Sequence, residues 1–434
     1  MNMVDIITKK RDGGELTPEE IRFFIDNYVK DRIPDYQASA LLMAIYFRGL
    51  SRAETFALTK VMEFSGDVED LSDLPGVKVD KHSTGGVGDK TTLVVAPVAA
   101  AAGVTVAKMS GRGLGFTGGT VDKLEAIPGF RTRLEPAEFH RQLEELGLAV
   151  ITQTGSITPA DKKIYALRDV TGTVESPGLI ASSIMSKKLA AGSDGIVLDV
   201  KCGSGALLKD LAEAEKLAEL MIDIGRKAGR KMVAVISDMS QPLGRAVGNA
   251  LEVEEAVQVL KGGGPADLRQ LCLELAGEMI WIGGRAESFE EGKETARQVL
   301  SDGRALEKFR QMVRRQGGDD RIVEEPERMG SSRYSRDVLA ARTGFIAEMA
   351  TQEIGRASQH LGAGRLRKED EIDFTAGIRM HVCIGNFVKE GDVLATLYGA
   401  DSRRLEEAEI IMEAAIRISA EPAAPPKLIQ KIIQ

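Results

Sequence analysis

Apolar and polar residues follow a helical spacing through the first part of the chain. Apolar side chains recur every three or four positions over residues 21–28 and 41–46, which places them on one face of a helix. The segments 17–20 (TPEE) and 51–54 (SRAE) have the composition of a capping box, in which a hydroxyl and a Glu satisfy the first free N–H groups of a helix. This pattern predicts three antiparallel helices joined by short turns.

Beyond Asp70 the pattern changes to short apolar runs rich in β-branched residues. The runs that we interpret as strands are 77–80, 105–109, 195–200 and 232–236. The small-residue stretch 93–102 and the segment 211–228 have helical character. Strands that alternate with helices are typical of an α/β domain with a largely parallel sheet.

A second helical segment, 161–189, interrupts this α/β pattern, so we expect domains assembled from discontinuous pieces. Charged and Gly-rich residues over 315–335 indicate a linker, and Gly-Asn and Glu-Gly-Asp sequences within 384–394 predict hairpins. The expected fold class is α/β with a separate all-α domain. The expected domains are a helical domain (1–66 and 160–193), a mixed or parallel-sheet α/β domain (75–155 and 194–330) and a C-terminal α+β lobe (336–434).

The net charge and the cysteines limit which binding partners and which cellular compartment we expect for this protein. The formal net charge of −8 argues against a nucleic-acid polymer or an anionic membrane as the main partner. Cys202, Cys272 and Cys383 lack the spacing of a zinc or redox site, which predicts reduced thiols in the cytosol. The longest apolar run, 93–102, is about half the length of a membrane span, and residues 1–12 carry no signal segment. We therefore expect a soluble, cytoplasmic protein.

Residues 80–89 (DKHSTGGVGD) join a predicted strand to Gly-rich backbone. Glycines let N–H groups approach an oxygen closely, the hydroxyls of Ser83 and Thr84 donate, and Lys81 supplies charge, as a phosphate site requires. The segment is not a Walker loop, because the lysine precedes the glycines. Taken alone, it fits a phosphate loop and a tight turn with a solvated lysine equally well.

Residues 110–120 (SGRGLGFTGGT) follow the next predicted strand and form a second loop of this kind. Five of the nine residues 111–119 are glycine, although each glycine costs about 1 kcal/mol of order relative to alanine. Loops that follow successive parallel strands meet at the carboxyl edge of the sheet, where ligands bind in open α/β folds. Two such loops together predict an orthophosphate site.

The third chemical segment lies in the predicted helical insertion. It contains Tyr165 and Arg168, followed by Ser183 and Lys187 at positions i and i+4 of a helix. A planar guanidinium, a hydroxyl and an ammonium suit a flat ring that bears carbonyl oxygens. On their own, such residues are more often surface or salt-bridged side chains.

Together these segments resemble a known family. The run 110–125 looks like the signature of the thymidine and pyrimidine-nucleoside phosphorylases, and 81–89 is similar to the phosphate loop of that family. The resemblance extends over essentially the whole chain. It implies a small helical domain hinged to a large α/β domain, and a homodimer with contacts through the helices. It also implies phosphorolysis of pyrimidine nucleosides to the free base and a pentose 1-phosphate, with phosphate as co-substrate and no organic cofactor.

The resemblance also implies roles for individual residues. His82, Arg168 and Lys187 would act in catalysis. The phosphate would be bound by Lys81, Ser83, Thr92, Lys108, Ser110 and Thr120. The pyrimidine would be bound by Tyr165, Arg168, Ser183 and Lys187. A potassium ion would be held by Gly88, Lys90, Leu243, Ala246 and Glu255, mainly through backbone oxygens.

The chain departs from the family pattern at several positions. Phe116 stands where His is frequent, Lys90 stands where Thr or Val is common, and Cys202 and residues 207–208 differ from the usual lining of the base pocket. On this interpretation Lys90 contributes only its carbonyl to the ion, and the choice between uridine and thymidine is open.

Two other classes of function are compatible with parts of the sequence. A phosphoribosyltransferase of anthranilate type shares the expected fold, but it needs acidic residues for a magnesium-bound diphosphate. The acidic pairs of this chain fall in helical or linker contexts: 144–145, 254–255 and 319–320. The predicted C-terminal hairpins resemble biotinyl-carrier or lipoyl-carrier sheets, but they lack the lysine-bearing tip of a carrier.

Overall fold

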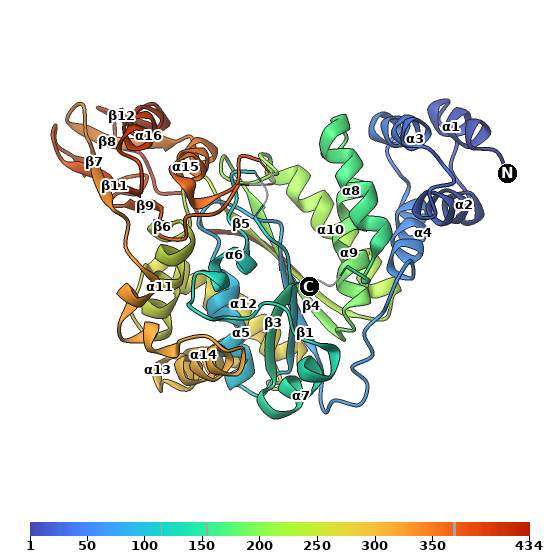
Figure 1. The fold of residues 1–434 in the computed structure, drawn as a ribbon, viewed down its shortest axis with the longest axis horizontal. Helices are drawn as coiled ribbons and strands as arrows, with labels where there is room; N and C mark the ends of the chain where they lie inside the picture. Colours follow the sequence, from blue (N-terminus) through green and yellow to red (C-terminus); the bar gives the residue numbers. More distant parts are fainter. Residues whose placement is uncertain (114, 153–154, 368–369) are drawn as a thin grey trace. The chain divides into compact units, whose positions relative to one another are not determined.

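The computed structural model describes residues 1–113, 115–152, 155–367 and 370–434 (Figure 1). The chain divides into two compact units, each built from separated stretches. The first contains Met1–Lys78, Gln153–Ile196 and Glu215–Met232, and the second contains Val79–Thr152, Val197–Ala214 and Val233–Gln434. The second unit therefore includes the C-terminal lobe together with most of the α/β segments.

The first unit is largely helical. Its helices are α1 (Met3–Arg11), α2 (Pro18–Val29), α3 (Asp35–Arg48), α4 (Arg52–Glu63), α8 (Pro159–Thr171), α9 (Pro177–Ala190) and the greater part of α10 (Leu211–Lys227). Both predicted capping boxes are present, at Thr17 with Glu20 and at Ser51 with Glu54. The expectation of three N-terminal helices was wrong by one, because the short α1 buries only Met3, Ile6 and Lys10 and so has little periodic signal.

The central sheet of the second unit has the strand order β1-β4-β5-β13. These strands are β1 (Val79–Ser83), β4 (Gly195–Cys202), β5 (Lys231–Asp238) and β13 (Ile429–Ile433). The parallel pair β2 (Val106–Ser110) and β3 (Leu148–Thr152) continues it, because the Val79 N–H donates to the Thr105 carbonyl over 3.0 Å. The four strands predicted from apolar runs are confirmed as β1, β2, β4 and β5.

Helices surround these strands (Figure 1). They are α5 (Thr91–Ala101), α6 (Thr120–Glu125), α7 (Pro136–Leu146), α11 (Asn249–Leu260), α12 (Ala266–Ile282), α13 (Phe289–Ser301) and α14 (Arg304–Arg315). Helix α5 is buried from Thr91 to Ala100, as its small-residue composition predicted. The sheet thus presents the ends of β1 and β2 to loops that lead directly into α5 and α6.

The C-terminal lobe contains two small sheets. Their strands and helices are β6 (Ala246–Val247), β7 (Tyr334–Leu339), β8 (Gly344–Met349), α15 (Thr351–Ser358), η3 (Gln359–Ala363), β9 (Gly377–Met380), β10 (Phe387–Val388), β11 (Val393–Gly399), α16 (Ser402–Ala415) and β12 (Ile416–Ser419). One sheet has the order β10-β8-β12 and the other β6-β9-β11-β7. The predicted hairpin between β10 and β11 was wrong, because the turn at residues 389–392 sends the two strands into different sheets.

Two other expectations for this half of the chain need correction. Strand β13 pairs antiparallel with β5, so the end of the chain belongs to the central sheet and not to the lobe. The segment 315–335 is packed, with short 3-10 helices at η1 (Asp320–Val323) and η2 (Pro326–Met329). Its Gln316 is fully buried and its amide donates to the carbonyls of Arg131 and Val150, which a mobile linker would not do.

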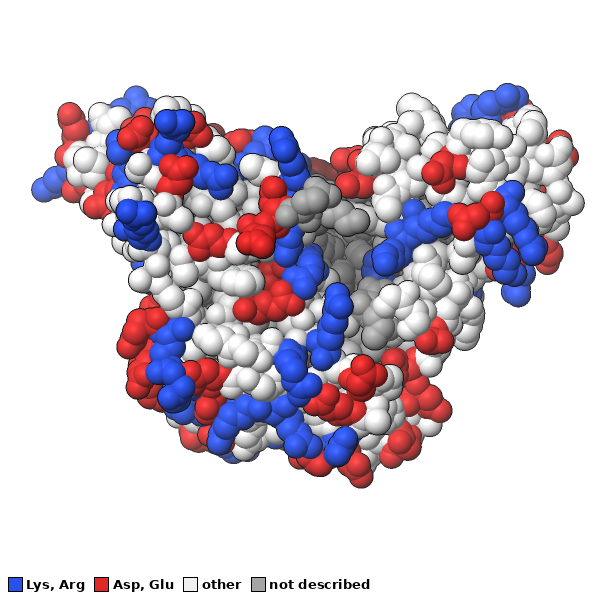
Figure 2. Space-filling view, in the orientation of Figure 1, with Lys and Arg blue, Asp and Glu red and all other residues white. Residues whose placement is uncertain are grey.

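The visible surface carries both signs of charge. Lys and Arg side chains are interspersed with Asp and Glu over the face shown in Figure 2. Within the described ranges, no helix combines the length and the apolar composition needed to cross a bilayer.

Candidate active site

Lys81 lies in a buried group of charges on β1. Its side chain is 2% exposed, and its Nζ lies 2.6 Å from the Thr91 hydroxyl and 3.1 Å from a carboxylate oxygen of Asp199. Burial acts to lower the pKa of Lys81, but the nearby carboxylates of Asp89 and Asp199 outweigh it and raise the pKa. Lys81 is therefore held as a cation.

Asp89 closes the first loop onto the start of α5. Its carboxylate accepts a short hydrogen bond from the Ser83 hydroxyl, and also bonds from the Thr91 N–H (3.2 Å) and the Thr91 hydroxyl (2.6 Å). Burial acts to raise the pKa of Asp89, but three buried lysines, led by Lys81, hold it well below its usual range. The loop is thus shaped by an ionised carboxylate that binds both of its ends.

The second loop begins at the end of β2. Lys108 on β2 lies 3.4 Å from a carboxylate oxygen of Asp80 on β1, which shows that the two strands are neighbours. At Gly119 a Cβ would lie 2.1 Å from the backbone nitrogen of Gly113, so the loop closes only without a side chain there. Asp122 on α6 accepts from the Gly113 N–H over 2.6 Å, which fixes the returning backbone.

Lys123 connects the two loops. Its Nζ donates to the Asp89 carbonyl in the first loop over 2.6 Å, lies 3.5 Å from the Gly118 carbonyl in the second, and pairs with Glu252 at 2.8 Å. The side chain is 1% exposed. The expectation that both Gly-rich loops lie side by side is confirmed by this bridge.

All six predicted phosphate residues lie in the second unit, on or directly after β1 and β2 or at the start of the following helix. Thr92 is in the first turn of α5, and Thr120 is the first residue of α6. The others are Lys81 and Ser83 on β1 and Lys108 and Ser110 on β2. His82 stands between Lys81 and Ser83 on β1.

The predicted base-binding residues lie in the first unit, on α8 and α9. The Lys187 Nζ donates to the Ser183 hydroxyl over 3.0 Å, as the i and i+4 spacing predicted, and to Asp161 over 2.6 Å. Lys187 keeps 25% of its side chain exposed, whereas Asp161 is 6% exposed. An accessible ammonium is thus oriented by a buried carboxylate on the neighbouring helix.

Arg168 is held by backbone oxygens. Its Nε donates to the Thr173 carbonyl (3.1 Å), its Nη1 to Leu179 (3.2 Å) and its Nη2 to Val174 (2.5 Å). Burial lowers the pKa of Arg168, yet a guanidinium stays protonated at neutral pH. The Tyr165 ring lies beside it, with its centroid 5.8 Å from the guanidinium carbon. Three bonds use three of the five N–H donors and the residue is 1% exposed, so the group is fixed in place inside the first unit.

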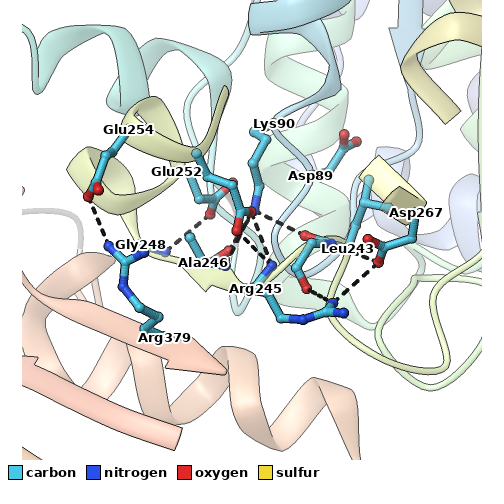
Figure 3. Close-up of polar contacts among 12 residues, drawn as sticks. Asp89, Lys90, Leu243, Arg245, Ala246, Gly248, Glu252, Glu254, Asp267 and Arg379 are labelled. Atoms are coloured by element: carbon cyan, nitrogen blue, oxygen red, sulfur yellow. Dashed lines mark hydrogen bonds and ion pairs between the residues drawn. The ribbon is translucent and has the colours of Figure 1, made fainter. Parts of the chain in front are cut away.

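The residues expected to hold potassium surround a lysine side chain. The Lys90 Nζ lies 3.0 Å from the Leu243 carbonyl, 2.7 Å from the Ala246 carbonyl and 2.6 Å from Glu255 Oε2 (Figure 3). The Lys90 carbonyl, which was expected to bind the ion, accepts from the Leu93 N–H in the first turn of α5. The Gly88 carbonyl accepts from the Lys90 N–H.

This arrangement does not fit a potassium ion. An ion on the same oxygens would lie against the Lys90 ammonium, and two unit charges 4 Å apart repel by about 4 kcal/mol at an effective dielectric constant of about 20. The ammonium also supplies the single positive charge that Glu255 requires. Of the five residues predicted as metal ligands, Leu243, Ala246 and Glu255 therefore surround an internal cation that the fourth, Lys90, supplies.

Several residues of these sites were not predicted. Asp199 and Lys201 are charged positions within the apolar strand β4, and their side chains are 2.8 Å apart with no solvent exposure. Asp161 and Lys123 are the partners that orient Lys187 and the two loops. The sequence held one signal that could have revealed such residues, namely a charged residue inside an otherwise apolar strand. This signal applies to Asp199 and Lys201.

Comparisons with known proteins agree with this geometry. The family described as "Glycosyl transferase family, a/b domain" matches residues 76–306, and the corresponding helical bundle domain matches 4–66. The family described as "Pyrimidine nucleoside phosphorylase C-terminal domain" matches 345–419. Proteins named pyrimidine-nucleoside phosphorylase from two Staphylococcus aureus strains, bovine RF122 / ET3-1 and MSSA476, are each 54% identical over 435 residues, covering 100% of both chains. The chain belongs to the pyrimidine-nucleoside phosphorylase family.

Membership of the pyrimidine-nucleoside phosphorylase family confirms the predicted fold class and the resemblance of the Gly-rich signature. A solved structure gives the same fold at lower identity. The anthranilate phosphoribosyltransferase of Thermus thermophilus aligns with a TM-score of 0.59 and 23% identity, covering 71% of this chain and 98% of that one. This chain thus shares its fold with a phosphoribosyltransferase.

Proposed function

We propose that this chain catalyses the phosphorolysis of pyrimidine nucleosides, with uridine, thymidine and deoxyuridine as substrates. The products are the free base and α-D-ribose or α-D-deoxyribose 1-phosphate, formed in nucleoside salvage or catabolism. The observation that carries the proposal is the full-length 54% identity to proteins named pyrimidine-nucleoside phosphorylase. The paired Gly-rich loops around Lys81 and the cationic residues on α8 and α9 supply the chemistry that this reaction needs.

In the proposed reaction the bond between C1′ and the ring N1 breaks while a phosphate oxygen bonds to C1′ from the opposite side. The electron pair of the broken bond passes to the pyrimidine, whose carbonyl oxygens gain negative charge. Arg168 and Lys187 stabilise that charge as donors already held in place. The sugar inverts, which gives the α-sugar phosphate.

The phosphate residues act before and during this step. Lys81 and the N–H groups of the two loops bind orthophosphate, with the hydroxyls of Ser83, Thr92, Ser110 and Thr120 as further donors. Lys108 lies beside them on β2. Bound phosphate takes the place of water as the nucleophile.

His82 has two candidate roles, which one measurement separates. It either donates a proton to the departing base or orients the ring. If His82 donates the proton, His82→Asn should lose the limb of the pH–rate profile that comes from titration of an imidazole. If His82 orients the ring, His82→Asn should lower the rate evenly across pH.

The direct test is an assay with uridine, thymidine and cytidine, each with and without phosphate. We expect uracil and thymine release only with phosphate, and an α-linked sugar phosphate by phosphorus NMR. Cleavage at the same rate in phosphate-free buffer would contradict phosphorolysis. A phosphoribosyltransferase would instead require added magnesium and a ribosyl diphosphate substrate.

We also propose that the protein is a cytoplasmic homodimer that contacts its second copy through the helices of the first unit. Helix α3 supports this, because Tyr36 and Phe47 on it are 75% and 76% exposed. Light scattering after size exclusion tests the dimer. A monomeric mass at micromolar concentration would contradict it, and Phe47→Asp should shift a dimer toward the monomer.

A further inference from the structure

The Lys90 ammonium satisfies every donor that it carries. Its three N–H groups face three acceptors: two backbone carbonyls, from Leu243 and Ala246, and one oxygen of Glu255. The Lys90 and Glu255 side chains are 0% and 2% exposed. The lysine is thus a closed internal cation and not a surface charge.

The backbone around the ammonium is built to enclose a small cation. Glu255 also accepts from the N–H groups of Arg245 and Ala246, at distances of 2.9 to 3.2 Å. Gly244 has a φ of +73°, and a Cβ there would lie 2.3 Å from Glu255 and 3.3 Å from the Lys90 Nζ. A Cβ at Gly88 would lie 2.9 Å from the Leu243 carbonyl. The backbone therefore curls around one positive charge, with the carboxylate on one side and carbonyls on the other.

We propose that the ammonium of Lys90 takes the place of a bound monovalent cation in this chain, so that neither its stability nor its catalysis depends on potassium. The part that concerns catalysis rests on the proposed function, whereas the part that concerns stability does not. The chemical class of the replaced ligand is a desolvated monovalent cation coordinated by carbonyl and carboxylate oxygens.

The position of Lys90 connects this internal cation to the phosphate loop. Lys90 follows Asp89, whose carboxylate binds Ser83, and precedes Thr91, whose hydroxyl contacts Lys81. Through Glu255 the ammonium fixes this junction to the middle of α11. Lys90 is thus a positioning residue, which holds the first turn of α5 without touching the reacting atoms.

The experiment compares the wild type with Lys90→Thr in potassium, sodium and choline chloride at equal ionic strength. For the wild type we expect the same melting temperature and the same phosphorolysis rate in all three salts. Lys90→Thr removes the charge and leaves a hydroxyl beside the carbonyl oxygens and Glu255. We expect it to melt lower in choline and to recover by a few degrees on titration with potassium, saturably, since a ligand bound only by the folded state stabilises it by mass action.

A matched control separates cation replacement from the loss of any buried lysine. Lys10 and Glu54 form a pair of the same kind in the first unit, at 2.7 Å and with 4% and 1% exposure, but among the described residues Lys10 donates only to the carboxylate and to no backbone carbonyl. Lys10→Thr should therefore lose stability and show no recovery with potassium beyond that in sodium or choline.

Two results would overturn the proposal. One is a saturable potassium effect on the melting temperature of the wild type, which needs no variant. The other is a Lys90→Thr protein that responds to potassium no more than Lys10→Thr does. If no nucleoside is cleaved at all, the melting data still decide whether Lys90 replaces the ion, and the proposed function fails separately.

Discussion

Two groups of cationic side chains in this protein are held in opposite ways. On β1, Lys81 lies among the carboxylates of Asp89 and Asp199, which raise its pKa. On α8, Arg168 is held by three neutral backbone carbonyls. In the arrangement on β1, the positive charge of Lys81 is essential to folding, because the carboxylates of Asp89 and Asp199 are buried with it. The arrangement on α8 fixes a cation in place and, among the described residues, leaves its charge without a contacting counterion.

Removal of Lys81 should have the largest effect. Lys81→Met leaves Asp89 and Asp199 without one of their lysines, and breaking a buried ion pair costs about 3–5 kcal/mol. We expect a fall of that size in the free energy of unfolding, measured in urea, together with loss of phosphate-dependent uracil release. The double variant with Asp199→Asn should recover part of the stability and none of the activity. An unchanged urea midpoint in Lys81→Met would show that the charged group does not stabilise the fold.

Arg168→Ala should lower turnover by about 10²–10³-fold, since it removes a preorganised donor to the leaving base. It also removes one donor from the carbonyls of Thr173, Val174 and Leu179, of which Val174 still accepts from the Ser176 N–H, so we expect a smaller loss of stability than in Lys81→Met. Steady-state kinetics and urea unfolding of the same preparation give both values. Arg168→Lys restores the charge but not the three-way contact, and near-normal turnover in it would assign the effect to charge alone.

Lys187→Ala should lower turnover by a similar factor of about 10²–10³. It also leaves the buried Asp161 carboxylate without its ammonium, so we expect some loss of stability beside the loss of turnover. A control is Lys163→Ala, which breaks another lysine–aspartate pair of the first unit at similar exposure of the lysine, although its partner Asp31 is exposed. Turnover in Lys163→Ala should stay near that of the wild type. Equal losses in the two variants would remove Lys187 from the chemistry.

The smallest effect is expected at Glu278, a buried carboxylate. It contacts an amide and, within the described part of the chain, it contacts no ammonium. Burial raises the pKa of Glu278 on α12 to about 7, although the Gln434 amide, 3.1 Å away, acts to lower it. The folded state therefore holds a proton that the unfolded state releases near pH 4.5, so stability is full below that pH and falls as the pH rises through 7. Glu278→Gln should remove this loss, which is at most about 3 kcal/mol at about 1.4 kcal/mol per pKa unit.

The control for that prediction lies on the same helix. Glu274 pairs with Lys293, so Glu274→Gln should destabilise the protein at pH 8, where Glu278→Gln stabilises it. Thermal unfolding between pH 5 and pH 8 measures both. A wild-type melting temperature that rises steadily across this range would contradict the assignment to Glu278.

Local signals in the sequence predicted the fold well. The capping boxes at Thr17 and Ser51 involve residues only three positions apart, so they were legible in the sequence and appear in the structure. The same holds for the pair of Ser183 and Lys187, one helical turn apart. The alternation of strands and helices likewise reported the α/β class.

What could not be predicted depends on contacts between distant residues. The turn at residues 389–392 was visible, but the partners of β10 and β11 are set by β8, β7 and β9. Lys90 was treated as a backbone ligand because nothing near it shows that its side chain reaches Glu255, 165 positions away along the chain. Each of these errors arose at a residue or strand whose partner is distant in the sequence and becomes a neighbour only in the folded structure.

Strand β13 has a consequence for synthesis on the ribosome. It pairs with β5 only after the whole C-terminal lobe has been translated, since its residues follow that lobe in the chain. Until then the outer edge of β5 offers unpaired N–H and C=O groups to any other nascent chain nearby. The growing polypeptide must protect that edge, and late closure of such a long-range pair also slows folding.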